Sequence, residues 1–480
     1  MNTKKNFLVL MVFLLAMHKG FAQDSLALDH VYSLKECVDI ALKNNADVNK
    51  TELLMENSKV SSTLAKANMY PFLSGQINHG LSTGRSIDPF TNTYINQNLS
   101  TANFNVDASL ALWNAGAIKN NIKANNLGYE ASRMDLQQQK DNTTISVILA
   151  YLQVLNNQEQ LNAAIQQADV TRKQVERLEV LNKDGAVAPG TYYDTKGQLA
   201  NDEMNVIALK NALETSRLTL TQLMNVLYAP DLKVEKINIG NNLALYDGSS
   251  RQIYNEALQN LALVKAVDLR KESADKTVKS ARGQMFPTLS LNGGVGTNYS
   301  SAATTANLLS TSDVRTDDYV LGDAGKLYVY TPQSQYSYPK ISYGSQWTNN
   351  FNTYVNIGLR IPILNGLQSK SRLNNARIDV KRTELEAKTT KTLLQQAVEQ
   401  AYLNMNTAYE RYEKLQTQVQ DFAESFRGAE VKFNEGAITS VDYLIIKNSF
   451  DRSNINLIAA KYDYILRTKI LDFYQGRLQL

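Results

Sequence analysis

The chain carries the same local pattern twice, 251 residues apart. Gly185-Ala186 and Gly436-Ala437 each interrupt a long, Gln-rich helical pattern. The same offset, without a gap, pairs residues 150–152 (Ala-Tyr-Leu) with residues 401–403. Self-similarity at a fixed spacing predicts two copies of one arrangement of elements. We therefore predict a first structural repeat over residues 23–240 and a second over residues 241–480.

Each repeat is expected to begin with a helix, over residues 34–69 and 251–285. The motifs "MYPFLS" and "MFPTLS" follow, and their prolines disfavour continuation of the helix. Two strands come next in each repeat. The offset between the repeats is 216 before these strands and 251 after them, which places an insertion at residues 296–347. We expect this segment to be a solvated loop at the outer surface. Its tyrosines include Tyr328, Tyr330, Tyr336, Tyr338 and Tyr343.

The helical patterns that follow the strands are long. Residues 118–183 contain no proline and one glycine, and a continuous helix of that length spans roughly 100 Å. Gly185 ends this pattern, and a second helical pattern runs over residues 191–227. The second repeat does the same around Gly436. Each Gly-Ala pair is therefore predicted to be the tip of a long antiparallel helical hairpin, in a mainly α fold with a small β part.

The amino terminus has the features of a secretory signal peptide. Lys4 and Lys5 precede a short apolar run over residues 7–17, and small residues Gly20 and Ala22 precede the expected cleavage point. The apolar run is too short to cross a bilayer. We expect residues 1–22 to be removed and the mature protein to be exported.

The composition argues against several classes of function. The net charge is +4, with Lys and Arg spread along the chain, whereas nucleic-acid binding usually leaves a clustered basic patch. Cys37 is the only cysteine, and His30 and His79 have no second ligand at metal-binding spacing. No nucleophile, phosphate-loop or dinucleotide motif is present. The sequence thus predicts neither an enzyme nor a cofactor site.

The strands alternate between apolar and polar residues. Residues 104–112 and 351–361 have apolar side chains at every second position, with Thr353 as a gap, and mainly polar residues between them. Four such strands cannot close a barrel, and an open strand edge is not tolerated in lipid. An outer-membrane barrel shared by several chains would solve this, with Trp113 in an interfacial girdle. A small soluble β-domain on a helical stalk is the alternative. In the barrel, the lumen would be lined by Asn105, Asp107, Asn352, Asn356 and Arg360.

Taken together, these motifs resemble the TolC family of outer-membrane efflux proteins. The resemblance rests on "YPFLS" and "FPTLS", on "LWNAG" and "PILNG", and on the two Gly-Ala tips in that order. The segment "GRSIDPFTNTYINQN", which begins near Arg85, is similar to a loop in members from the Bacteroidetes. The resemblance implies a homotrimer with a 12-stranded outer-membrane β-barrel and a long periplasmic α-helical barrel. It also implies a passive exit duct that meets a periplasmic adaptor protein and an inner-membrane pump.

The same resemblance places a constriction at the hairpin tips, where acidic side chains form rings. Asp442 matches the first aspartate of the family's second-half tip, and Ile445 stands where a second aspartate is usual. Thr191 replaces an aspartate in the first-half tip. Phe433 and Ile438 occupy the positions of a tyrosine and an arginine that lock the closed state, so that lock is absent here. The alternative is that Asp442 is an N-cap or first-turn carboxylate of the next helix, a role that can coexist with the ring.

The tips are also the expected contact with the adaptor protein, through Gly185, Ala186, Gly436 and Ala437. A different class of function stays open at this point. The chain could be a periplasmic coiled-coil structural protein, or an adaptor, that forms no pore. Adaptors of this kind usually carry one hairpin and a lipoyl-like domain, so two hairpins with paired strands favour the duct.

Overall fold

The computed structural model describes residues 30–87, 92–96, 98–237, 240 and 243–477. These residues divide into two compact units, and each unit takes segments from both halves of the sequence. The first unit contains residues 30–60, 126–273 and 380–477, and the second contains residues 61–125 and 274–379. The two sequence repeats stay a prediction. The expected signal peptide, residues 1–22, lies outside the described residues.

The longer helices occur as pairs of matching length, in the same order in both halves of the chain. The members of the pairs have 11 and 11, 22 and 22, 67 and 67, and 36 and 35 residues. The first half has α2 (Leu34–Asn44), α3 (Ala46–Ala67), α4 (Ala117–Lys183) and α5 (Pro189–Met224). The second half has α6 (Ser250–Asn260), α7 (Ala262–Gly283), α9 (Gln368–Asn434) and α10 (Ser440–Tyr474). The expected mainly α fold is confirmed.

The helices expected over residues 34–69 and 251–285 are each broken in two, which corrects the sequence reading. The junction residues Asn45 and Leu261 have extended backbones, with ψ of 126° and 132°. Asn45 Oδ1 accepts a hydrogen bond from the Asp47 N–H at 2.9 Å and so caps the start of α3. At the other junction, the Leu263 N–H donates to Gln138 of α4 at 3.0 Å. These bonds satisfy amide groups that a helix start leaves unpaired.

The first apolar cluster of the first unit surrounds Tyr151, which is fully buried. The cluster brings together side chains of α2, α4, α5 and α10, including Cys37 and Leu220. The Tyr151 hydroxyl lies 2.8 Å from the Glu235 carbonyl oxygen and 3.1 Å from the Tyr32 carbonyl oxygen. It thereby ties the core to two short parallel strands, β1 (Val31–Tyr32) and β6 (Lys233–Val234).

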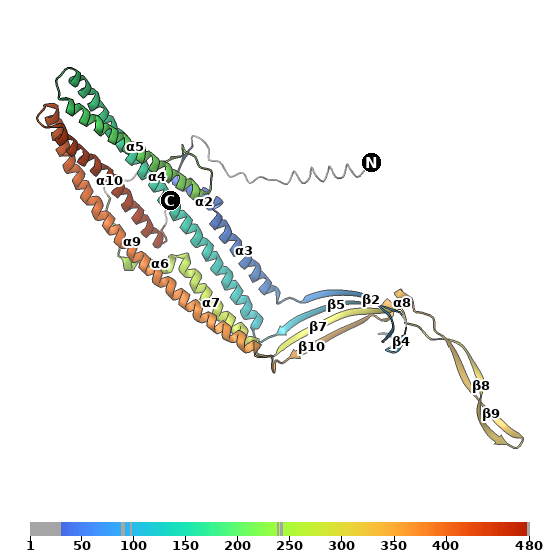
Figure 1. The fold of residues 1–480 in the computed structure, drawn as a ribbon. Coiled ribbons are helices and arrows are strands. Elements are labelled where there is room, and N and C mark those ends of the chain that lie inside the picture. Colours follow the sequence, from blue (N-terminus) through green and yellow to red (C-terminus); the bar gives the residue numbers. More distant parts are fainter. Residues whose placement is uncertain (1–29, 88–91, 97, 238–239, 241–242, 478–480) are drawn as a thin grey trace, which may run out of the picture. The chain divides into compact units, whose positions relative to one another are not determined.

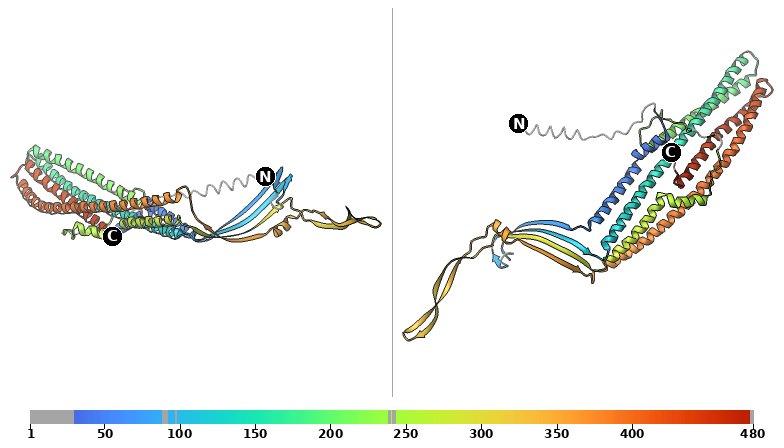
Figure 2. Two further views of the ribbon diagram at one scale, coloured as in Figure 1. Left: turned by 90° about the horizontal axis from the view of Figure 1, so that it is seen from below. Right: turned by 180° about the vertical axis from the view of Figure 1, so that it is seen from behind.

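A second apolar cluster lies between α6, α7, α9 and α10, with Val398 and Met405 at its centre. Helix α10 contributes Tyr462 to the first cluster and Tyr464 to the second. The α4–α5 and α9–α10 hairpins lie side by side, with α10 against α5 (Figures 1 and 2). Helix α10 therefore joins the two hairpins of the first unit.

The second unit contains a four-stranded antiparallel sheet in the order β10-β7-β5-β2. Its strands are β2 (Phe72–Ser82), β5 (Leu99–Trp113), β7 (Thr288–Ser300) and β10 (Asn352–Arg360), which lie side by side in Figure 1. Both outer strands, β2 and β10, have one edge without a partner strand in the described part of the chain. The short strands β3 (Arg85–Ile87) and β4 (Tyr94–Asn96) pair with each other.

The Tyr-rich insertion, expected as a loop, forms regular structure. Strands β8 (Asn307–Gly322) and β9 (Gly325–Ser337) make a long antiparallel hairpin, followed by helix α8 (Tyr343–Asn349). The Arg315 guanidinium lies 3.2 Å from the centre of the Tyr328 ring, and the Lys326 ammonium lies 4.1 Å from the centre of the Tyr319 ring. Such cation–π contacts across the strands favour an ordered hairpin over a loop.

None of the helices in the described part of the chain is both long enough and apolar enough to cross a lipid bilayer.

Candidate functional site

The first hairpin tip is a glycine-based helix end. Gly185 has φ of +70°, a left-handed backbone conformation that residues other than glycine rarely adopt. The Ala186 N–H donates to the Leu181 carbonyl at 2.8 Å, and the Gly185 N–H donates to the Asn182 carbonyl at 3.1 Å. This pair of bonds is the Schellman motif, which satisfies the last carbonyls of α4. Pro189 then starts α5.

The second tip repeats this geometry. Gly436 also has φ of +70°. The Ala437 N–H donates to the Lys432 carbonyl at 2.7 Å, and the Gly436 N–H donates to the Phe433 carbonyl at 3.1 Å. Neither tip glycine has another group within 4 Å of the position a Cβ would take, so their backbone angle, not crowding, explains the residue type. The two Gly-Ala pairs thus share one physical cause.

Asp442 lies at the start of α10 and takes part in a capping arrangement. Its N–H donates to Thr439 Oγ1 at 3.1 Å, and the Thr439 hydroxyl lies 2.7 Å from its carboxylate oxygen Oδ2. Thr439 is the N-cap residue of α10. Asp442 is therefore not the N-cap itself but a first-turn carboxylate that contacts the N-cap residue, and its side chain remains exposed. A contribution to a constriction stays a prediction.

The other predicted aperture residues occupy the same ends of α5 and α10. Ile445 is 59% exposed, one turn beyond Asp442. Thr191 is in the first turn of α5, and its carbonyl accepts from the Thr195 hydroxyl at 2.9 Å. These two helix starts are joined directly, because the Ser440 hydroxyl donates to Asp194 Oδ2 at 3.1 Å. The structure therefore brings both tips together through residues that the sequence did not single out.

Aromatic side chains hold the second hairpin closed on itself. Phe433 stacks on Tyr443 with 4.5 Å between ring centres, and Phe426 stacks on Phe450 with 5.4 Å. Both pairs join α9 to α10. Phe433 thus packs within its own hairpin. Tyr443 is nearly fully buried, and burial raises the pKa of its hydroxyl to about 12.

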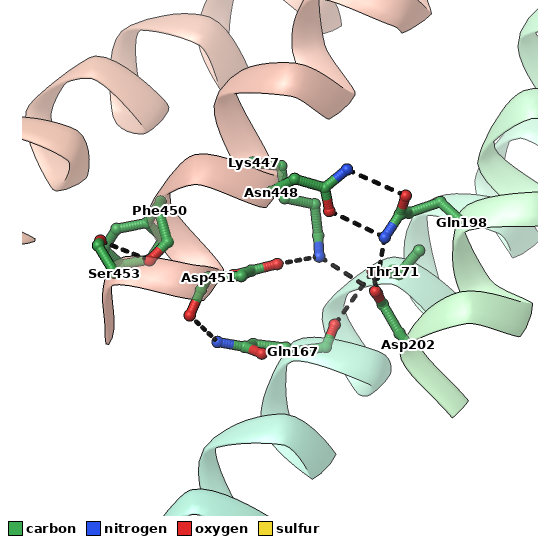
Figure 3. A network of polar contacts seen from close by, with 9 residues as sticks. All are labelled: Gln167, Thr171, Gln198, Asp202, Lys447, Asn448, Phe450, Asp451 and Ser453. Atoms are coloured by element: carbon green, nitrogen blue, oxygen red, sulfur yellow. Dashed lines mark hydrogen bonds and ion pairs between the residues drawn. The ribbon is translucent and has the colours of Figure 1, made fainter. Parts of the chain in front are cut away.

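Further from the tips, a charged cluster is buried where α10 packs against the first hairpin (Figure 3). Lys447 is 1% exposed, and its ammonium group bonds to the carboxylates of Asp202 and Asp451. The distance from Lys447 Nζ to Asp202 Oδ2 is 3.2 Å. Asp202 also accepts from the Thr171 hydroxyl at 2.5 Å and from the Gln198 amide at 2.7 Å.

An amide pair lies beside this charged cluster. The side chains of Gln198 and Asn448 exchange two hydrogen bonds, of 2.9 and 3.2 Å. The Gln167 amide of α4 donates to the backbone carbonyl of Asp451 at 3.3 Å. The spacing of Asp194, Gln198 and Asp202 on α5 is four residues, which places all three on one face of the helix. That spacing is the sequence signal that could have predicted the α5–α10 seam, the line of contact that contains Asp194, Gln198 and Asp202 of α5 and Ser440, Lys447 and Asn448 of α10.

The five predicted lumen residues share one face of the sheet. Their register shows this, since Asn105 and Asn352 both pair with Gly296, on opposite sides of β7. Neighbouring polar residues continue the face on every strand. The polar residues of this face include Ser74, Gln76, Asn78, Asn103, Asn105, Asp107, Ser109, Asn292, Asn352, Tyr354, Asn356 and Arg360, and the register also places Phe72 and Ala111 on it. What this face lines stays a prediction.

Glycines of β7 make room for contacts across that strand. The Tyr354 hydroxyl donates to Asp107 Oδ1 at 2.7 Å, although β7 lies between their strands. A Cβ on Gly294 would meet Asp107 Oδ1 at 2.7 Å and a ring carbon of Tyr354 at 2.8 Å. A Cβ on Gly296 would meet Asn105 Oδ1 at 2.6 Å. The glycines of the "GGVG" segment therefore leave room for the side chains of Asn105, Asp107 and Tyr354 to lie over β7. The sequence analysis missed Tyr354 because its hydrogen-bond partner is 247 residues away.

No group of three or more His, Cys, Asp or Glu side chains suited to a metal ion occurs within the described ranges. Cys37 is buried in the first apolar cluster, and burial raises the pKa of its thiol to about 12. A protonated, enclosed thiol is a poor nucleophile and a poor metal ligand.

The family model for "outer membrane efflux protein" matches residues 37–226 and 253–476. The chain belongs to this family. Its members are channels without enzymatic activity, so the chain is an outer-membrane efflux protein and not an enzyme. The Bacteroidetes affiliation of its loop stays a prediction, and part of that loop, residues 88–91 and 97, lies outside the described residues.

Among curated proteins, the chain is similar to toxin and drug export protein A of Aggregatibacter actinomycetemcomitans. The two are 22% identical over 450 residues, which cover 90% of this chain and 83% of the relative. An uncharacterised protein of Haemophilus influenzae is also 22% identical, over 90% of this chain and 84% of its own length.

Solved channel structures have the same fold. CusC matches with a TM-score of 0.72 and 16% identity, over 95% of this chain and 96% of its own. The Campylobacter jejuni CmeC outer membrane channel matches with a TM-score of 0.72 and 16% identity, over 92% and 85%. VceC of Vibrio cholerae matches with a TM-score of 0.72 and 14% identity, over 92% and 96%.

Proposed function

We propose that three copies of this chain form a passive exit duct through the outer membrane, fed by an inner-membrane pump through a periplasmic adaptor. The observation that carries the proposal is the four-stranded sheet. It has one mainly polar face, one mainly apolar face and, in the part of the chain that the structure describes, two strand edges without partners. Three such sheets joined edge to edge would leave no open edge, which is the condition for a β-structure in lipid.

The apolar face of the sheet supports contact with lipid. Val355, Ile357 and Leu359 lie on this face of β10 and are 79%, 67% and 60% exposed in the single chain. The opposite face carries mainly neutral amides and hydroxyls, with Asp107 and Arg360 as charged residues. In the proposed barrel this polar face lines the lumen. A largely neutral lining suits a duct in which the pump selects the cargo.

Helical surfaces support association with further copies. Leu385, Leu393 and Leu403 on α9 are 65%, 58% and 61% exposed. On α3, Leu53 and Val60 are 65% and 66% exposed. Exposed apolar stripes of this kind mark interaction surfaces in stable proteins. In the proposed trimer, they are buried between neighbouring chains.

The hairpin tips are proposed as the periplasmic end of the duct. Three Asp442 carboxylates would form a ring there, with Ile445 and Thr191 beside it, and would favour cations. Gly185, Ala186, Gly436 and Ala437 would contact the adaptor. Replacing Asp442→Asn keeps an oxygen that can accept from Thr439 but removes the charge. The cation preference of single channels in planar bilayers should fall, and an unchanged preference would exclude the ring.

Substitutions of two neighbouring residues of β10, whose side chains lie on opposite faces of the sheet, test the trimer and which face of the sheet meets lipid. Val355→Arg places a charge on the proposed lipid face, at a cost of about 2–4 kcal/mol near the bilayer midplane. Asn356→Arg places the same charge on the proposed lumen face. We expect detergent-corrected light scattering of outer-membrane extracts to give a trimer for wild type and Asn356→Arg, and much less for Val355→Arg. A wild-type monomer in the soluble periplasm would instead favour the pore-free coiled-coil protein.

A further inference from the structure

An open groove of about 470 Å³ lies on the apolar face of the four-stranded sheet, beside helix α8. We propose that this groove holds one acyl chain of an outer-membrane lipid. The inference rests on the proposed duct, because it requires the apolar face of the sheet to meet lipid. It adds a defined lipid site to that face. The side chains that line the groove include Ile77, Phe104, Val106, Val295, Trp347 and Phe351.

The strand register explains why the sheet is hollowed at this point. Phe104 of β5 pairs with Ile77 of β2, and both lie on the face opposite the predicted lumen residues. Val106, the next residue of β5 on this face, pairs with Val295 in β7 and with Gly75 in β2. Nothing lies within 4 Å of the position that a Cβ on Gly75 would take. The missing side chain therefore leaves space between larger apolar neighbours.

Helix α8 forms one wall of the groove. It lies at the end of the sheet from which the β8–β9 hairpin extends (Figure 1). The ring centre of Trp347 is 4.3 Å from that of Phe104, and the Thr297 hydroxyl donates to the Trp347 carbonyl at 2.9 Å. The Tyr343 ring contacts both Trp347 and Tyr299, with 5.9 and 4.6 Å between ring centres. Aromatic side chains of helix and sheet thus form one ledge.

A buried glutamine fixes α8 to the sheet. Gln346 is 1% exposed. Its Oε1 accepts from the Ser300 N–H at 2.9 Å, and its Nε2 donates to the carbonyls of Ser300 and Ile341, both at 3.0 Å. Breaking these bonds would leave buried polar groups unpaired, so α8 is held firmly in place. The groove is therefore preformed, and a ligand can enter without the cost of ordering its walls.

The position of the groove along β5 matches a membrane interface. Trp113 follows Phe104 by nine positions, and both lie on the apolar face. At about 3.3 Å per residue and a strand tilt of about 40°, they are about 23 Å apart along the membrane normal. Outer-membrane barrels have an apolar band about 25 Å tall between two aromatic girdles. Trp113 would mark one girdle, and Tyr343 with Trp347 the other.

The chemistry of the groove favours a hydrocarbon chain. None of the side chains that line it is charged. On β10, Val355 continues the same apolar face and is 79% exposed, so the groove opens onto a surface suited to lipid. Cargo in the proposed lumen would lie on the opposite face of the sheet. A neighbouring copy would pair with the strand edges of β2 and β10, which leaves this face free.

The groove should hold a chain more firmly than the surrounding lipid does. In a bilayer the hydrophobic effect does not favour one apolar site over another, so retention depends on packing. Many close contacts with flat aromatic walls supply that packing for a straight chain. A chain with methyl branches fits such walls less closely. We therefore expect the groove to prefer straight chains over branched chains.

The two tryptophans of the chain provide the test. Trp113→Phe leaves Trp347 in the groove, and Trp347→Phe leaves Trp113 as a reference outside it. Each variant would be placed in vesicles of diphytanoyl phosphatidylcholine, which has branched chains. A straight-chain phosphatidylcholine that carries bromine on one acyl chain would then be added, because bromine quenches tryptophan fluorescence on contact. Quenching of Trp347 should reach half its maximum at a brominated fraction about tenfold lower than quenching of Trp113.

Variants that fill the groove sharpen this test. Gly75→Leu and Val295→Phe, each added to Trp113→Phe, fill it from different strands. Either should bring the quenching curve of Trp347 to that of Trp113. Ala108→Leu is the matched control, because it adds bulk to the same face outside the residues that line the groove. It should keep the tenfold preference. A preference that survives both filling variants would overturn the site.

The quenching curves also separate the lipid site from the duct. If Trp347 and Trp113 are quenched equally at every brominated fraction, the groove is refuted and the lipid-facing sheet stands. If neither tryptophan is quenched in vesicles that contain the protein, the apolar face does not meet lipid. That outcome would refute the proposed barrel, and the lipid site with it.

Discussion

Helices α5 and α10 meet along a seam whose two ends differ in the polarity of the contacting side chains. Near the tips, the contacting side chains are polar or charged, as in Asp194 with Ser440 and Asp202 with Lys447. Near the base, the first apolar cluster takes over, with Leu220, Met224 and Tyr462. Apolar burial is lost almost entirely when a helix moves away, whereas polar groups regain bonds to water. We therefore expect the apolar end of the seam to keep α5 and α10 together, and the polar end near the tips to separate at lower cost.

The reactivity of Cys37 should give the largest contrast between these regions. Burial, and to a lesser extent the charge of Glu36, raises the pKa of this thiol to about 12. The contribution of the Cys37 thiol to the free energy of unfolding is fully present below the ordinary thiol pKa of about 8.5. It is lost as pH rises through the raised pKa of the folded state. At pH 8, maleimide should modify Cys37 about a thousandfold more slowly than an unfolded control, since access requires opening of the base.

A cysteine placed at the polar end sharpens that experiment. Gln198→Cys in a Cys37→Ala background should react with maleimide far faster than Cys37, because this part of the seam opens at lower cost. Equal protection of both thiols, measured by mass spectrometry over time, would mean that the two ends of the seam do not differ.

Truncation of an apolar side chain at the base should have the next largest effect. Leu220 is fully buried, and Leu220→Ala should lower the free energy of unfolding by about 2–5 kcal/mol. The matched control is Leu227→Ala, because Leu227 is 52% exposed. Thermal unfolding of the purified protein would compare them, and similar melting temperatures for the two variants would argue against a base held by apolar packing.

The tip glycine should tolerate substitution less well than a glycine inside the same hairpin. Gly436→Ala forces a side chain into a left-handed backbone, at a cost of about 1–2 kcal/mol. Gly428→Ala adds a methyl group inside α9, where nothing lies within 4 Å, and should stabilise by up to about 1 kcal/mol. Opposite shifts in melting temperature are expected, and shifts of the same sign would remove the conformational explanation of the tip.

Loss of the cap at α10 should have the smallest effect of these. Thr439→Ala removes the acceptor for the Asp442 N–H and should cost about 1 kcal/mol. Thr439→Ser keeps that acceptor and should remain close to wild type. Amide hydrogen exchange at residues 440–443 would detect the local fraying, and equal exchange in both variants would show that the hydroxyl has no capping role.

Much of the fold follows from local rules that act on neighbouring residues. Backbone angles and side-chain periodicity determine the long helices, the breaks at Gly185 and Gly436, and the alternation in β5 and β10. These features can therefore be predicted from the residues at those positions. The same rules overlooked the breaks at Asn45 and Leu261. Asparagine and leucine both occur within helices, and these junctions depend on hydrogen bonds that include one from the Leu263 N–H to the distant Gln138 side chain.

The site divides in the same way. The sequence by itself determined where the tips are and which residues share the polar strand face, because both follow from the order and spacing of residues along the chain. Only the tertiary structure decided that Lys447 meets Asp202 and that Tyr354 reaches Asp107 over Gly294. Those partners are more than 240 residues apart, and no local preference of either residue selects the other. They meet because the packing of helices and the register of strands bring them within bonding distance.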